Sequence, residues 1–304
     1  MSPSGAAKGL VVMAYGTPAS PGDVEAYYTH IRRGRPPAPE QLAELTARYR
    51  AIGGTSPLAE RTRAQVDGIA AALESAAPGG WRVALGNKHA APFVEDAVGE
   101  LVAAGVERVV GLVLAPHFSR GSVGEYHARA SEVAAKRGVT YTAIDRWHDE
   151  AAWLDAQAAG VRDGLGRLPG GAKVLFTAHS LPERVLEGDP YVDELRASAA
   201  AIAGRAGLED WTGWALAWQS AGRTPEPWRG PDILDVIRQL GATGAEGVLV
   251  CPQGFVSDHL EVLYDLDVEA AKVAAEAGLA FARTASINDD PAVMGALAAR
   301  VRRT

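Results

Sequence analysis

The chain has 304 residues, of which 47% are hydrophobic and 22% charged, and its formal net charge is −7. This composition is typical of a soluble globular protein, and the length predicts two domains. The basic residues form no long block, so the sequence disfavours nucleic acid as a partner. Cys251 is the only cysteine, which excludes an intrachain disulfide and a cysteine-built metal cluster and is compatible with a reducing compartment.

The N-terminal segment contains only a short apolar run before Tyr15. This run is too short for the core of a signal peptide or for a membrane span. We therefore expect a cytoplasmic protein without a membrane span. The negative net charge suits a cationic or apolar ligand better than a polyanion.

Short apolar runs rich in β-branched residues alternate along the chain with longer, alanine-rich segments of helical period. The runs cover residues 10–14, 82–87, 108–114, 140–144, 173–178, 213–218, 247–251 and 279–284. The helical segments cover residues 57–76, 93–104, 125–136, 150–164, 192–205, 232–240 and 257–276, and a further helix closes the chain. Repeated strand–helix units predict parallel sheets. We expect an α/β protein of two doubly wound, Rossmann-like domains, each with a four-stranded parallel sheet.

The boundary between these domains is expected near residues 145–150, where the fourth run ends and a new helix begins. The N-terminal domain would comprise residues 1–147 and the C-terminal domain residues 148–287. We expect the last helix, within residues 288–304, to pack back onto the N-terminal domain.

Several histidine and aromatic side chains follow directly after the predicted strands. Ligands of open parallel sheets bind outside the carboxyl ends of the strands. If two such edges face each other, one cleft would contain His89, His117, His179, Tyr15, Trp218 and Glu261. A structural interpretation stays open as well, because a histidine after a strand is more often a loop or capping residue than a ligand, and the aromatic residues could be half-buried.

Residues 257–269, SDHLEVLYDLDVE, combine the apolar spacing of a helix with a row of acidic side chains. Glu261, Asp265 and Glu269 stand at i, i+4 and i+8, where like charges cost roughly 0.2–0.5 kcal/mol per pair. A solvated helix surface and a metal site both explain this row, since His259 adds an imidazole and a bound cation would remove the repulsion. If all three carboxylates point at the cleft, the helix should bulge toward π geometry, as helices do at functional sites.

Seven motifs occur in a fixed order from about residue 10 to the last helix. They are MAYGTP (13–18), YYTHIRRGR (27–35), RYRAIGGTSPLAERT (48–62), LAPHFS (114–119), AHSLPERV (178–185), WQSAGRTPEPWRGPD (218–232) and GFVSDHLEVLYDLDVE (254–269). Together they resemble the ferrochelatase family, and most closely the monomeric coproporphyrin ferrochelatases of Gram-positive bacteria. The joint occurrence of AHSLPE and SDHLEVLYD is specific and favours the metal-site interpretation.

The resemblance implies two Rossmann-like domains around a porphyrin cleft, with the metal site in the C-terminal domain. By motif position, it implies that His179 and Glu261 bind Fe²⁺ and are catalytic. It also implies that Asp265 and Glu269 hold an outer hydrated cation such as Mg²⁺, and that Tyr15 is an axial ligand to the product iron. The remaining matches are Arg32, Arg48, Tyr49, Ser56 and Tyr126 near the porphyrin propionates, with His89 and Trp218 as candidates for the cleft.

These residue types suit metal insertion into a porphyrin. His179, with an unperturbed pKa of about 6.5, can accept a proton near neutrality. Two protein ligands leave positions open on the ion, whereas a closed tetrahedral site would retain it. Arginines bind carboxylates in a bidentate way, so Arg32 and Arg48 suit the propionates, while no role is assigned to Arg50.

The resemblance therefore predicts a monomeric ferrochelatase that inserts Fe²⁺ into coproporphyrin III in haem biosynthesis. Tyr15 favours this substrate, because relatives that make protohaem usually have a GGP-like sequence there. One alternative is a protoporphyrin IX ferrochelatase, and another is a non-catalytic tetrapyrrole or haem carrier. A haem carrier would need Tyr15 but not Glu261. We expect no permanently bound cofactor and no iron–sulfur cluster. The expected partners are coproporphyrin III, Fe²⁺ and, transiently, neighbouring enzymes of the haem pathway.

Overall fold

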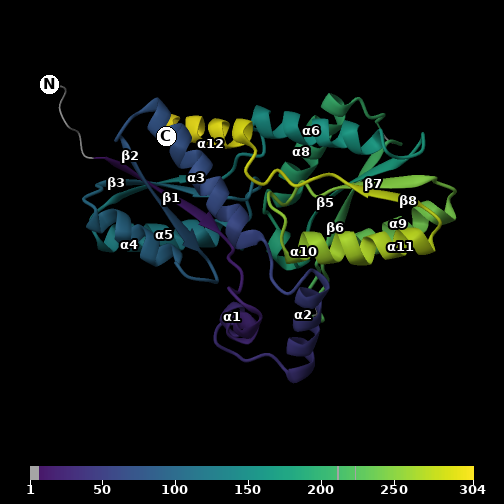
Figure 1. Ribbon diagram of the computed structural model, residues 1–304, viewed down its shortest axis with the longest axis horizontal. Helices are drawn as coiled ribbons and strands as arrows, with labels where there is room; N and C mark the ends of the chain where they lie inside the picture. Colours follow the sequence, from purple (N-terminus) through teal and green to yellow (C-terminus); the bar gives the residue numbers. More distant parts are fainter. Residues whose placement is uncertain (1–6, 211, 223) are drawn as a thin grey trace. The chain divides into compact units, whose positions relative to one another are not determined.

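The computed structural model describes residues 7–210, 212–222 and 224–304. The chain divides into two compact units: unit 1 is drawn from Met1–Trp147 and Asn288–Thr304, and unit 2 from His148–Ile287 (Figure 1). The described residues form one four-stranded parallel sheet in each unit. The predicted α/β fold class is confirmed.

The sheet of unit 1 has the strand order β2-β1-β3-β4. Its strands are β1 (Lys8–Ala14), β2 (Trp81–Asn87), β3 (Arg108–Val113) and β4 (Thr140–Ile144). The central strand β1 is almost entirely buried, since helices cover both faces of a parallel sheet. This double burial explains why β1 reads as a continuous apolar run rather than an alternating one.

Helices cover both faces of this sheet (Figure 1). On one face lie α4 (Val94–Ala103) and α5 (Val123–Lys136), and on the other lie α3 (Leu58–Ala76) and α12 (Pro291–Arg303), which pack against each other. Between β1 and α3 the chain forms η1 (Pro21–Asp23), α1 (Val24–Ile31) and α2 (Pro39–Ala51). The apolar periodicity does not predict α1 and α2, because each buries a single residue, Val24 and Tyr49 respectively.

The sheet of unit 2 repeats the same topology, with the strand order β6-β5-β7-β8. Its strands are β5 (Lys173–His179), β6 (Trp214–Gln219), β7 (Gly247–Cys251) and β8 (Ala280–Arg283). All eight observed strands agree with the predicted runs to within two residues at each end. In both units, the first strand lies between the second and the third. The chain therefore builds the sheet to one side of the first strand and then crosses to its other side for the third and fourth strands.

The helices of unit 2 form a layer on each face of its sheet (Figure 1). On one face lie α6 (Ala151–Leu165) and α8 (Tyr191–Ala206), and on the other lie α9 (Ile233–Ala242), α10 (Leu260–Tyr264), η2 (Asp265–Ala270) and α11 (Ala271–Glu276). The short α7 (Glu183–Leu186) follows β5. The second layer packs on strands β5, β6 and β7 through a core that includes Ile237, Leu266 and Val273. No helix in the described ranges is both long and apolar enough to cross a membrane.

The acidic segment after β7 is not one continuous α-helix. It begins at Leu260 rather than at 257, and η2 is a π-helix between α10 and α11. The predicted π geometry is confirmed. Four α-helical residues turn about 400°, so each step in an i, i+4 row advances by about 40°. A π turn contains more residues than an α turn, so four residues advance by less than a full turn and offset this drift. The row formed by Glu261, Asp265 and Glu269 therefore stays closer to one face of the helix.

Candidate functional site

The centre of the unit 2 sheet brings His179 close to the segment that follows β7. β5 ends at His179, and its neighbour β7 ends at Cys251. Crossovers diverge between these two strands, and ligands of such sheets bind at this point. The loop after β7 packs on β5: the Gly254 N–H donates to Thr177 O at 2.9 Å, and a Cβ on Gly254 would lie 2.5 Å from the Cβ of Ala178.

A carboxylate between two imidazoles is the main feature of this site. Glu261 Oε1 lies 3.6 Å from His179 Nε2, and Glu261 Oε2 lies 3.6 Å from His259 Nε2. His179 Nδ1 donates to the Ser180 carbonyl, and His259 Nδ1 donates to Ser257 O. Each Nε2 therefore faces Glu261, while each Nδ1 is fixed by the backbone. The side chains of His179 and Glu261 are about one-third exposed, at 34% and 35%.

The charges of this group are strongly coupled. Burial lowers the pKa of His179, but the Glu261 carboxylate and the Ser180 carbonyl more than offset this and raise the pKa to about 9. Burial raises the pKa of Glu261, but His179 and His259 hold it well below its usual range. At neutral pH the pair is an imidazolium and a carboxylate. A proton therefore lies between the two side chains.

The end of β6 supports both members of the pair. Gln219 lies beside His179 in the sheet, and its Nε2 donates to Glu261 O at 3.2 Å. The Tyr191 hydroxyl donates to His179 O at 3.3 Å. Both contacts hold backbone atoms and leave the imidazole and the carboxylate open to a ligand.

Asp265 and Glu269 continue from Glu261 along the π-helix. Asp265 is buried, with 5% of its surface exposed, and accepts a hydrogen bond from Ser220 Oγ. Ser220 has a left-handed backbone with φ of 59°, which turns the chain directly after β6. Glu269 is partly exposed. Among the described residues, no three His, Cys, Asp or Glu side chains converge as a preformed metal site.

In unit 1, a cluster of aromatic and histidine side chains surrounds the end of β1. Tyr15 is 45% exposed, and its ring centroid lies 4.7 Å from that of His89. The backbone N–H of His89 donates to the backbone carbonyl of Tyr15 at 3.0 Å, and the ring Nδ1 of His89 lies 3.0 Å from the Nδ1 of His30. Burial, with the nearby Lys88 ammonium, lowers the pKa of His89 to about 4, so this imidazole is neutral. The exposed Tyr15 phenol ring therefore packs against the neutral imidazole of His89.

The five residues matched to propionate contacts are divided between two environments in unit 1. Arg32 caps α1, Arg48 lies on α2, and these two helices pack against each other. Ser56 Oγ accepts from Leu58 N–H at 3.2 Å at the start of α3. Ser56, Tyr49 and Tyr126 are buried, with 9%, 3% and 4% of their surfaces exposed, whereas Arg32 and Arg48 are not.

Two expected cleft residues are buried instead. Trp218 is 2% exposed and packs with Ala178, Tyr191 and Leu195. His117 is 3% exposed. The Trp218 ring packs in the core beside the end of β5.

Some residues that contact the pair or the acidic row were not among the predicted site residues; they include His259, Gln219, Ser220 and Tyr191. His259 stands two residues before Glu261, a spacing at which helical side chains do not face each other. His259 is the N-cap of α10 with an extended backbone, at φ −156° and ψ −179°, so the helical rule does not apply to it. The only available signal was an imidazole directly before the acidic row.

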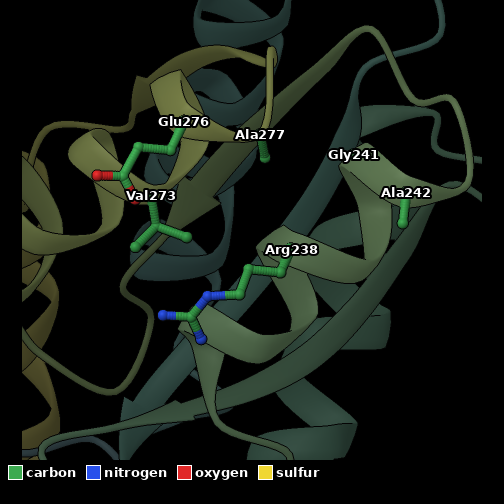
Figure 2. Close-up of a pocket in the computed structure, with 6 residues that line it drawn as sticks. All are labelled: Arg238, Gly241, Ala242, Val273, Glu276 and Ala277. Atoms are coloured by element: carbon green, nitrogen blue, oxygen red, sulfur yellow. The ribbon is translucent and has the colours of Figure 1, made fainter.

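A separate shallow pocket lies between α9 and α11 on unit 2. Figure 2 shows Arg238, Gly241 and Ala242 on one side and Val273, Glu276 and Ala277 on the other. A Cβ on Gly241 would lie 2.7 Å from Ala277 O, so the two helices approach closely here. The lining contains no histidine and none of the residues around Glu261. This pocket is a gap at the ends of two helices, distinct from the site described above.

Comparisons with known proteins agree with the fold and the motifs. A family model described as Ferrochelatase matches residues 7–304. The coproporphyrin III ferrochelatase of Geobacillus kaustophilus (strain HTA426) is 45% identical over 301 residues, covering 96% of this chain and 94% of the relative. That of Bacillus subtilis (strain 168) is 44% identical over 298 residues, covering 95% of each chain. A protein named ferrochelatase from Herpetosiphon aurantiacus is 42% identical, covering 95% of this chain and 96% of the relative.

Two solved structures share the fold at low sequence identity. SirB from Bacillus subtilis with Fe³⁺ has a TM-score of 0.60 at 12% identity, covering 98% of this chain and 95% of that one. CbiX, described as the terminal enzyme for biosynthesis of siroheme in denitrifying bacteria, has a TM-score of 0.53 at 15% identity, with 98% and 99% covered. These two similarities concern the fold alone.

Proposed function

The chain belongs to the ferrochelatase family, whose reaction inserts Fe²⁺ into a porphyrin, and we propose that its porphyrin is coproporphyrin III. The product would be iron coproporphyrin III, or coprohaem, in haem biosynthesis. The relatives named above as coproporphyrin III ferrochelatases support this choice, and so does Tyr15 at the end of β1. The expected cytoplasmic location, monomeric state and transient contacts with neighbouring pathway enzymes stay predictions.

The observation that carries the proposed metal insertion is the His179–Glu261 pair at the carboxyl end of the unit 2 sheet. We propose that Fe²⁺ binds between Nε2 and the carboxylate and displaces the proton held there. Because only these two side chains would bind the ion, several of its positions stay available for porphyrin nitrogens. His179 or Glu261 would then accept a pyrrole proton as the ion leaves for the ring, and the coupled pair would share this task.

The other site residues would bind and orient the two substrates. Arg32 and Arg48, on the two helices before α3, would bind propionates, together with Tyr49, Ser56 and Tyr126. The exposed Tyr15 phenol would ligate the iron of the product. Asp265 and Glu269 would hold a hydrated cation such as Mg²⁺ on the π-helix, because an all-oxygen pair suits a hard ion.

Anaerobic incubation with Fe²⁺ and either coproporphyrin III or protoporphyrin IX tests the proposal by visible absorption. We expect metallation of coproporphyrin III at a higher kcat/KM than of protoporphyrin IX. His179→Ala and Glu261→Gln should each lower kcat by at least about 100-fold, since each removes a ligand and a proton acceptor. Glu132→Gln, which changes an exposed carboxylate of unit 1, is the matched control and should leave the rate unchanged.

Each alternative has its own outcome in this experiment. Faster metallation of protoporphyrin IX would contradict the substrate assignment. Tight binding without metallation of either porphyrin would indicate a tetrapyrrole carrier. A wild-type rate in His179→Ala would contradict the role of the pair.

A further inference from the structure

A single arginine of β8 contacts both flanks of the segment that carries Glu261. Arg283 Nε and Nη2 donate to the two carboxylate oxygens of Asp267, at 2.7 and 2.9 Å. Arg283 Nη1 donates to Asp258 Oδ1 at 3.2 Å, and this oxygen also accepts from Ser286 Oγ at 2.9 Å. The Arg283 side chain is only 14% exposed. The guanidinium is therefore largely covered, while the Asp267 carboxylate that it binds is 39% exposed, and all three of its nitrogens donate in fixed directions.

The two carboxylates bracket the metal-site part of the segment. Asp258 precedes the N-cap of α10, and Asp267 lies inside the π-helix η2. Glu261 and Asp265 lie between them. One guanidinium therefore fixes the distance and the rotation between the start of α10 and the middle of η2.

This fork is sensitive to whether the π turn is present. Conversion of η2 to regular α-helix would shift the register between Asp258 and Asp267 by one residue. A shift of one residue rotates a side chain by about 100° around the helix axis. The Asp267 carboxylate would then no longer meet Arg283 in a bidentate way while Asp258 kept its own contact. Both contacts are present together with the π-helix in this structure.

We propose that Arg283 is a positioning residue that holds α10 and η2 in the π-containing form and so keeps Glu261 beside His179. This inference rests on the proposed function, because Glu261 matters only if the pair binds the metal. Charge supports it: burial lowers the pKa of Arg283, but Asp267 and Asp258 more than offset this and raise it, so the fork stays protonated. From the other side, Gln219 and Ser220 at the end of β6 bond to the same segment.

A purely stabilising ion pair would behave differently from a positioning residue. It would lower stability without changing how the folded protein binds metal. Arg283→Lys separates the two cases, because lysine keeps the charge but lacks the planar fork needed for Asp267 and Asp258 together. Asp267→Asn is a second variant that removes the bidentate partner and keeps the arginine. Arg205→Met is the matched control, since Arg205 Nε pairs with Asp155 at 2.9 Å in the same unit and does not contact the segment.

The experiment measures Co²⁺ affinity without porphyrin, the separate KM values for Fe²⁺ and coproporphyrin III, and crystal structures of the variants. For Arg283→Lys and Asp267→Asn we expect about 10- to 100-fold weaker Co²⁺ binding, the range found when residues that orient metal ligands are changed. The KM for Fe²⁺ should rise while that for coproporphyrin III stays unchanged, and the crystal structures should show residues 260–270 rearranged. Arg205→Met should match wild type in all three.

Two results would overturn the inference: unchanged Co²⁺ affinity in both variants, or weakened affinity with the π-helix and Glu261 in place. Failure of the proposed function would be recognised separately, because the wild-type protein would then metallate no porphyrin. The crystal structures of the variants would still show whether Arg283 maintains the π-helix.

Discussion

Replacing Glu261 by glutamine should change how metal binding depends on pH. In the wild-type protein, the carboxylate 3.6 Å from His179 Nε2 raises the pKa of His179 to about 9. An imidazole must lose its proton before that nitrogen can bind a metal, so a cation that binds His179 Nε2 would have to displace this proton. With a pKa of about 9, roughly 1 in 100 His179 imidazoles is neutral at pH 7, so the affinity for a divalent ion should rise about tenfold per pH unit up to about pH 9.

In Glu261→Gln, the cause of the raised pKa is absent. Burial is then opposed only by the Ser180 carbonyl and the Asp265 carboxylate, which contribute less than Glu261, so the pKa of His179 should fall to its ordinary value or below. Most of the imidazole is then neutral at pH 7. The absolute affinity should fall because a ligand is lost, but its dependence on pH above 7 should disappear.

Calorimetric titration with Co²⁺ at pH 7, in two buffers of different ionisation enthalpy, measures the protons released per ion. We expect about one proton for wild type and close to none for Glu261→Gln. His148→Gln is the matched control, because His148 Nδ1 lies 3.5 Å from Glu194 in a second His–Glu pair of unit 2. Equal proton release from wild type and Glu261→Gln, or release lost only in His148→Gln, would refute the reasoning.

Four further outcomes follow from the geometry. Tyr15→Phe should change the visible spectrum of the bound iron product but not the melting temperature, since the ring is 45% exposed. Arg48→Met should raise the KM for coproporphyrin III about tenfold with little change in kcat, because it would remove the charge-assisted hydrogen bond proposed between Arg48 and a propionate. Gly254→Ala should lower the free energy of unfolding in urea by about 1–3 kcal/mol, because its Cβ would lie 2.5 Å from the Cβ of Ala178. The raised pKa of His179 and the lowered pKa of Glu261 mean that their pairing stabilises the metal-free protein fully between about pH 4.5 and 6.5. This contribution is lost as the pH rises through 9, where unfolding of wild type and Glu261→Gln should converge.

The strands could be predicted because their burial is local to the sequence. β1 and β7 are covered on both faces, so they appear as uninterrupted apolar runs. α1 and α2 lack this signal, since each buries one side chain and the apolar period is too weak to detect. The break in the helix after β7 could be predicted for a different reason: acidic side chains at i, i+4 and i+8 drift around a regular α-helix, so they can all face one cleft only if the helix departs from α geometry.

The contacts within the site depend on residues far apart in the chain or on non-helical backbone. Ser220 and Asp265 are separated by 45 positions, and a left-handed serine after a strand has no sequence signature. His259 meets Glu261 only because its backbone is extended at the N-cap. Trp218 shows why the buried residues of the site could not be told from its exposed ones. A side chain at the end of a strand can point into the core as easily as toward a ligand, and sequence spacing alone does not distinguish the two.

The proton between His179 and Glu261 also has a consequence over a complete turnover. If Fe²⁺ displaces it, as proposed, the charge of the site would rise by one unit rather than two, so less positive charge would accumulate beside the porphyrin. When the ion passed to the ring, two pyrrole protons would leave, and one of them could return to His179 while the other went to solvent. The enzyme would then begin the next cycle in its starting protonation state, with no separate step to recharge the base.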